Sequence, residues 1–184
     1  MLTLQQIITE ADILVPNVLA IGDKVAQLNA INHDFFNVVK IPKLARFTGV
    51  AGQSDYVLPN DARAKNIDLV KCGLLQYRDL QTDGVMPAQN NYSFDDFTRM
   101  LTLSPAPYQN GLQGICRFHR IATTVFSPTS LNVNPDAPAE YHWSYVPALA
   151  AWMANTQDDG VKAAIYTDQY KAAWNVAAQN YQKE

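Results

Sequence analysis

The chain has 184 residues, of which 17% are charged, and its formal net charge at pH 7 is −3. A chain of this length can fold around its own core without a metal or a disulfide framework, and its charged fraction is below the roughly 25% that is usual in soluble domains. No window gathers Lys and Arg as tight nucleic-acid binding requires, and the longest near-apolar run, Tyr145 to Ala154, is too short for a membrane span.

Residues 1–43 are expected to form two helices. Thr3 and Gln6 have the spacing of a capping box, and the first helix should end before Pro16. A second helix should begin near Gly22. Its apolar residues recur every three or four positions and share one face: Ile21, Val25, Leu28, Ile31, Phe35 and Val39. Asn32 lies within this face and therefore needs a hydrogen-bond partner, either nearby backbone or another subunit.

Residues 44–137 have a β-rich pattern, with six of the eight glycines and most of the alternating β-branched and aromatic residues. Residues 46–48 and 56–58 flank a polar, Gly-containing link, which predicts a hairpin. Further strands are expected over 67–77, 99–103 and 115–126. In the last of these, Cys116 and Phe118 should face the side opposite to Ile115 and Arg117.

Residues 138–184 return to helical periodicity. Pro147 allows two interpretations: Ser144 caps a helix whose first turn contains Pro147, or Pro147 kinks a longer helix. A final helix should start around 156–159 and run to about Gln182. This helix carries two apolar stripes on nearly opposite sides. The first stripe is Tyr166, Tyr170, Ala173, Trp174, Ala177 and Tyr181, and the second is Val161, Ile165, Ala172 and Val176.

A helix with two apolar stripes needs two neighbours. They are either two parts of the same bundle, or the core of the subunit on one side and a second chain on the other. The patterns together predict an α+β protein: a helical bundle from the N- and C-terminal helices (1–43 and 138–184) with an inserted antiparallel β domain (44–137), forming one structural unit.

Residues that carry chemistry are scattered. Cys72 and Cys116 lack neighbouring ligands and are interpreted as buried apolar residues. The pair Asp95 and Asp96 indicates a turn or strand end, because no third ligand follows at a recognised spacing. The cluster of Arg117, His119 and Arg120 favours a cross-strand ion pair over nucleic-acid contact. We expect no cofactor, no metal and no catalytic site; a small hydrolase using His33 or His119 is the remote alternative.

Three stretches and the order of elements resemble a known family. The stretches are Asp55-Tyr56-Val57-Leu58-Pro59, Leu101-Thr102-Leu103-Ser104-Pro105-Ala106-Pro107 and Pro138-Ala139-Glu140-Tyr141-His142. They resemble the head-to-tail adaptor, or connector, proteins of tailed bacteriophages. The resemblance covers nearly the whole chain and implies a structural, non-enzymatic protein of the virion neck, assembled in the host cytoplasm.

The resemblance also implies partners. It implies a ring of identical subunits that matches the twelvefold symmetry of a portal, with a tail or nozzle protein on the far side. DNA would pass through the channel without specific binding, which suits a mildly acidic chain, and no membrane would be involved. The alternative is a head-closure or tail-completion protein that binds another neck component. The candidate subunit or portal interface comprises Tyr166, Tyr170, Trp174, Tyr181, Asn180, Gln182, Lys183 and Glu184.

Overall fold

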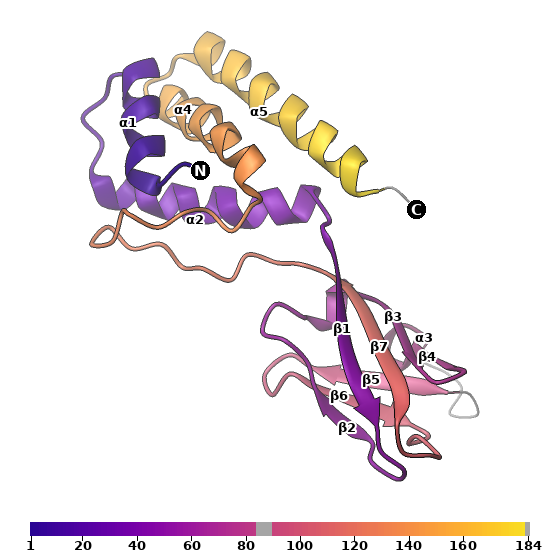
Figure 1. The fold of residues 1–184 in the computed structure, drawn as a ribbon. Coiled ribbons are helices and arrows are strands. Elements are labelled where there is room, and N and C mark those ends of the chain that lie inside the picture. Colours follow the sequence, from indigo (N-terminus) through magenta and orange to yellow (C-terminus); the bar gives the residue numbers. More distant parts are fainter. Residues whose placement is uncertain (84–89, 183–184) are drawn as a thin grey trace. The chain divides into compact units, whose positions relative to one another are not determined.

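The computed structural model describes residues 1–83 and 90–182, and the chain divides into two compact units (Figure 1). We call residues 1–40 and 122–184 the helical unit, and residues 41–121 the β unit. The helical unit contains α1 (Leu4–Leu14), α2 (Ile21–Val38), the 3₁₀ segment η2 (Ala139–Ser144), α4 (Tyr145–Thr156) and α5 (Gly160–Tyr181). The protein is therefore of mixed α+β class, as the sequence predicts. No described helix combines the length and apolar character that a membrane span needs.

The start of α1 follows from its capping box. Thr3 Oγ1 accepts the Gln6 N–H at 3.3 Å, and Gln6 Oε1 accepts the Thr3 N–H at 2.9 Å. The two bonds satisfy amide groups that a helix start leaves without intrahelical partners. The helix ends at Leu14, before Pro16. Both predicted limits of this helix are confirmed.

The apolar face of α2 lies in the core of the helical unit. Five of the predicted residues are buried: Val25, Leu28, Ile31, Phe35 and Val39. The prediction is wrong for Ile21, the first residue of the helix, which is 42% exposed, so the buried face begins only at Val25. The central helix of the unit is α4, which contacts α1, α2 and α5.

Pro147 is the third residue of α4, so it occupies the first turn, where its missing N–H has no cost. The first of the two predicted interpretations is therefore correct for the position of Pro147. Ser144 precedes the helix, but its side chain does not cap it. Instead, Ser144 Oγ donates to the Tyr141 carbonyl at 2.7 Å.

Two asparagines on α2 fasten the extended segment that follows the β unit. Asn29 exchanges two hydrogen bonds with the backbone of Phe126, at 3.1 and 2.8 Å. Asn32 Nδ2 donates to Asp136 Oδ2 at 2.9 Å, and Asn32 Oδ1 accepts the Tyr145 hydroxyl at 2.9 Å. The predicted need of Asn32 for partners is confirmed, and these partners lie within the same chain.

The strands of the β unit form one sheet in the order β1-β7-β3-β4-β5-β6-β2. The unit contains β1 (Pro42–Gly49), β2 (Asp55–Val57), η1 (Ala64–Asn66), β3 (Ile67–Cys72), β4 (Leu75–Asp79), α3 (Leu80–Asp83), β5 (Asn91–Asp95), β6 (Met100–Ser104) and β7 (Leu112–His119). All described pairs are antiparallel except β4 with β5, which is parallel. The sheet is therefore mixed, where the sequence predicts an antiparallel one.

The sheet curls around a core formed by one of its faces. Cys116 and Phe118 are fully buried on this face, as the alternation along β7 predicts. The rings of Phe47 on β1 and Tyr56 on β2 lie 4.4 Å apart, although these strands are at opposite ends of the strand order. The curl therefore brings side chains of the first and last strands into contact.

Several strand predictions are wrong in detail. The expected hairpin of 46–48 with 56–58 does not form, because β1 pairs with β7 and β2 pairs with β6. The expected strand over 67–77 is two strands, because Gly73 adopts a φ of 59° in a tight turn. The sequence patterns do not predict β5, and β7 ends at His119, short of the predicted limit at Phe126.

Candidate functional site

Helix α5 carries the candidate interaction surfaces, and its start fixes their orientation. Asp159 Oδ1 accepts the Lys162 N–H at 3.1 Å, and Asp159 Oδ2 lies 3.3 Å from Lys162 Nζ. The hydrogen bond from the Lys162 backbone is the main cause of a lowered pKa for the Asp159 carboxyl. A negative charge at this end also interacts favourably with the helix dipole. The predicted start and end of the final helix are confirmed.

One stripe of α5 faces the core of the helical unit. Trp174 is only 4% exposed, its indole N–H donates to Ser144 Oγ at 2.9 Å, and its ring meets Phe35 edge-on at 5.6 Å. Tyr170 lies against Trp174 with ring centroids 4.8 Å apart. Tyr166 and Tyr181 are half-buried. The predicted aromatic stripe is therefore brought together, and Trp174 is packed within its own chain.

The other stripe of α5 faces solvent. Val161, Ile165 and Val176 are 73%, 51% and 55% exposed, and Ala172 between them is exposed as well. These four residues share one helix face, unlike single exposed residues, which are common on any protein, and the exposed Asp168 lies on the same face between Ile165 and Ala172. We call Val161, Ile165, Ala172 and Val176 the outer stripe of α5.

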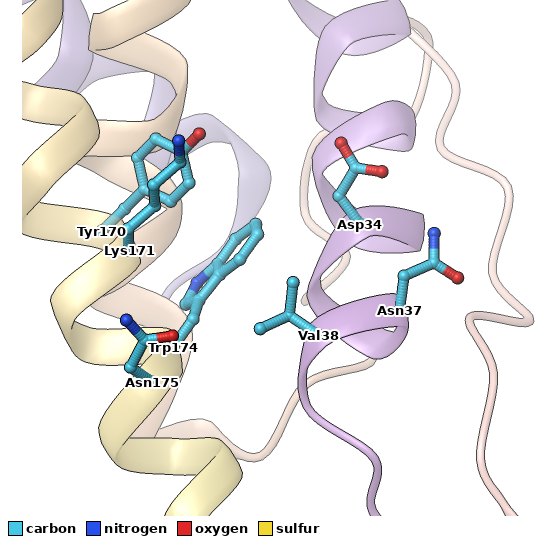
Figure 2. Close-up of a pocket in the computed structure, with 7 residues that line it drawn as sticks. All are labelled: Asp34, Asn37, Val38, Tyr170, Lys171, Trp174 and Asn175. Atoms are coloured by element: carbon cyan, nitrogen blue, oxygen red, sulfur yellow. The ribbon is translucent and has the colours of Figure 1, made fainter.

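A groove lies between α5 and α2 (Figure 2). Its volume is about 320 Å³. Figure 2 shows Val38 of α2 facing Trp174 of α5, with Asp34 and Lys171 on opposite walls. Burial, together with the negative charge of Asp34, raises the pKa of Tyr170, which also lines the groove. The groove has an apolar floor between two opposite charges.

The end of α5 contains the remaining candidate residues. Asn180 is exposed, and its Nδ2 donates to the Tyr141 hydroxyl at 3.3 Å. Gln182 is exposed and follows the last helical residue. Lys183 and Glu184 lie outside the described residues.

The three histidines lie in different surroundings. His33 is exposed on α2. His119 Nδ1 lies 3.1 Å from Asp68 Oδ2 across strands β7 and β3, so a cross-strand pair forms with the histidine of the predicted cluster. His142 is buried, and its Nε2 lies 2.8 Å from the Ala137 carbonyl oxygen.

The two thiols are buried, and the paired carboxylates lie at a strand end and in the turn that follows it. Cys72 and Cys116 are buried and free, as predicted, and burial raises the pKa of Cys116 to about 12. Asp95 ends β5, and Asp96 lies in the turn that follows, which confirms the predicted strand end. Asp96 Oδ1 accepts the Ala64 N–H at 2.7 Å. Within residues 1–83 and 90–182, no group of three or more His, Cys, Asp or Glu side chains could hold a metal ion.

Each edge strand of the β unit carries an exposed apolar residue that the sequence patterns do not identify. Leu44 on β1 is 53% exposed and Val57 on β2 is 63% exposed. Each stands beside a buried residue, Ala45 or Tyr56. An exposed apolar residue on the outward face of an alternating strand indicates a contact surface, but only if the strand is known to lie at the edge of a sheet.

Comparison with known proteins identifies a family for this chain. The family model described as the SU10 adaptor protein matches residues 2–183, nearly the whole chain. A search of curated proteins finds no significant match. The family match confirms the resemblance to phage adaptor proteins, and such proteins have a structural role. The chain belongs to the SU10 adaptor protein family.

Proposed function

We propose that this protein is a head-to-tail adaptor of a tailed phage. Copies of the chain form a closed ring beneath the portal, in the virion neck, and join the DNA-filled head to a tail or nozzle protein. Family membership supports the adaptor role. The ring and its position beneath the portal are our inference.

The main support for a ring is the exposure of the outer stripe of α5. Val161, Ile165 and Val176 are exposed, while Trp174 on the other side of the same helix holds α5 to its own unit. Burial of apolar area is worth about 25 cal/mol per Å², so covering the stripe with a neighbour favours association. A ring made from identical copies needs heterologous contacts, in which two different surfaces of the subunit meet.

The groove between α2 and α5 supplies the second surface in this proposal. It lies on a different side of α5 from the outer stripe, and its floor of Val38 and Trp174 is apolar. The outer stripe of one copy would pack along the groove of the next. The net charge of −3 further supports a channel through which DNA slides without being held. We assign the portal contact to the end of α5, at Asn180, Gln182 and the residues that follow.

The test is assembly of the purified chain with the portal of the same phage, followed by light scattering and electron microscopy. The wild type should add to the portal as a complete ring. The double variant Ile165→Glu/Val176→Glu should stay folded by circular dichroism and fail to form rings, because it places charges in an apolar contact. Gln5→Glu, at an exposed position on α1 outside both proposed surfaces, is a control for added negative charge.

Failure of the wild type to add to the portal as a ring would contradict the proposed function. Normal rings from the double variant would leave the function intact but remove the outer stripe from the contact. A ring that forms on another neck component and ignores the portal would instead indicate a head-closure protein.

A further inference from the structure

The β unit has two strands with open edges, β1 and β2. They are the first and last strands in the sheet order, and within the described residues neither pairs with another strand on its outer side. An open edge presents a row of main-chain donors and acceptors that can pair with another chain. Natural proteins usually protect such edges or use them.

The outward-facing residues of β1 follow from its register. The Ile41 carbonyl accepts the Arg120 N–H at 2.9 Å, and the antiparallel pairing with β7 continues from this bond. Residues that bond to a neighbouring antiparallel strand alternate along the strand. Leu44, Arg46 and Thr48 therefore direct their main-chain groups away from β7. No described residue forms a hydrogen bond with these outward groups.

The same reasoning applies to β2. The Leu103 N–H donates to the Ser54 carbonyl at 2.9 Å, so Ser54 faces β6. By alternation, Asp55 and Val57 direct their main-chain groups outward. Gln53 Nε2 donates to the Asp55 carbonyl at 2.8 Å. Within the described chain, the N–H of Asp55 and both main-chain groups of Val57 have no hydrogen-bond partner.

The side chains on the two edges are complementary. Arg46 and Asp55 are both exposed and carry opposite charges. Leu44 and Val57 are both apolar and more than half exposed. In an antiparallel pairing that sets Arg46 opposite Asp55, Leu44 stands opposite Val57. All four are outward-facing residues, so this one register satisfies charge, apolar burial and main-chain hydrogen bonding together.

We propose that β1 of one copy pairs antiparallel with β2 of a neighbouring copy, with Arg46 opposite Asp55 and Leu44 opposite Val57. The pairing joins the β units into a continuous sheet from copy to copy. This pairing rests on the proposed function in one respect: the partner is taken to be a neighbouring subunit of the ring. It would be a second contact between subunits, in addition to the contact made by α5.

Two features favour a second copy as the partner. Both complementary edges belong to the same sequence, so a heterologous ring uses each edge once and leaves none open. Within one chain the two edges do not pair with each other, and each strand bonds only to its inner neighbour. The parallel orientation is disfavoured, because it cannot set the charged pair and the apolar pair opposite each other in a single register.

Charge reversal provides the test, because it distinguishes pairing between copies from pairing within one chain. Arg46→Glu alone sets two negative charges opposite each other, and Asp55→Arg alone sets two positive charges opposite each other. Each single variant should associate about tenfold more weakly than the wild type, as expected for an attractive cross-strand pair made repulsive. Ring formation with the portal and sedimentation of the free chain are the measurements.

Mixing the two single variants should restore assembly. In an alternating ring, the glutamate introduced at position 46 of one copy would meet the arginine introduced at position 55 of the next. At the following contact the unchanged Arg46 would meet the unchanged Asp55, so every contact is attractive. Rescue only in the double variant Arg46→Glu/Asp55→Arg, and not in the mixture, would indicate pairing within one chain and overturn the proposal. Wild-type behaviour of both single variants would overturn it as well.

A disulfide experiment separates this proposal from the proposed function. A chain with Leu44→Cys is mixed under oxidising conditions with a differently tagged chain carrying Val57→Cys. Cross-strand neighbours meet the distance requirement of a disulfide, and the native thiols of Cys72 and Cys116 are buried. A mixed dimer that forms without any portal ring supports the edge pairing and counts against the adaptor ring. Portal rings without the mixed dimer support the ring and overturn the edge pairing.

Asp55 also bonds within its own chain, which requires a control. The Thr102 hydroxyl donates to Asp55 Oδ1 at 2.7 Å. Thr102→Val removes this bond and keeps the charge of Asp55. It should assemble like the wild type. Loss of assembly in Thr102→Val equal to that in Asp55→Arg would assign the effect to folding of the β unit and overturn the proposal.

Discussion

The indole N–H of Trp174 donates to Ser144 Oγ at 2.9 Å and ties the last helix to the start of α4. Ser144 in turn donates to the Tyr141 carbonyl at 2.7 Å. Because both Trp174 and Ser144 are buried, no water can replace the bond if one partner is removed. This contact determines which side of α5 faces its own unit, and the outer stripe on the other side stays exposed.

Replacement of Trp174 should therefore destabilise the helical unit. Trp174→Ala should lower its free energy of unfolding by about 3 to 5 kcal/mol, because it leaves a cavity beside Phe35. Chemical denaturation followed by circular dichroism measures the change. Trp143 is 52% exposed and is a matched control, for which Trp143→Ala should change stability far less. Equal losses in the two variants would contradict the assigned core position of Trp174.

The helix limits could be predicted because their causes are local. A capping box at Thr3, a proline at position 16 and a capping aspartate at position 159 act within a few residues of the helix ends. The direction in which α5 faces could not be predicted. Both of its stripes are apolar, and only its contact with α4 and α2, made by residues far away in the sequence, selects the side of Trp174 as the inner one.

The strand pairing could not be predicted for a similar reason. A polar link between β1 and β2 is compatible with a hairpin, but each strand gains more pairing elsewhere: β1 matches β7 over its full length, and β2 extends the edge beyond β6. The short alternating stretch of β5 has too few residues to distinguish a strand from a turn. The complementarity of the edge residues depends on the sheet order, which is set by pairing between strands far apart in the sequence.

The Asp136 carboxylate should make stability depend on pH. Burial raises its pKa, but hydrogen bonds from Thr124, Asn32 and Thr123 outweigh this, so the pKa lies below the usual value of 3.8. Because the folded-state pKa is depressed, the carboxylate stabilises the fold above about pH 4, and this contribution is lost as the pH falls through the folded-state value.

Asp136→Asn tests this contribution. It should lower the free energy of unfolding at pH 7 by about 2 kcal/mol, because the hydrogen bonds now end on a neutral group. The difference from the wild type should shrink as the pH is lowered below about 4. Asp168→Asn, an exposed position on α5, is the control. A difference that stays constant down to the acid transition would contradict the role of the charge.

The buried thiols should be almost unreactive in the folded protein. At pH 8, a thiol with a pKa of about 12, as for Cys116, is ionised in about one molecule in ten thousand, compared with about one in ten for a pKa of 9.0. Labelling with a thiol reagent should therefore be at least about a thousandfold slower in buffer than in denaturant. Rapid labelling of Cys116 in the folded chain would show that this part of the β unit opens readily.

Gly114 on β7 should tolerate no side chain, because the ring of Phe47 on β1 occupies the space that a Cβ atom would need. Gly114→Ala should cost about 1 to 3 kcal/mol through overpacking. Gly160 has open space around it, so Gly160→Ala should not destabilise the protein. The double variant Gly114→Ala/Phe47→Leu should lose less than the sum of the single losses, since the smaller side chain relieves the overlap. Additive losses in denaturation experiments would contradict the direct contact. Phe47 on β1 also packs against Tyr56 on β2. The same stability measurements therefore report on the core that supports the two edge strands that we propose for subunit pairing.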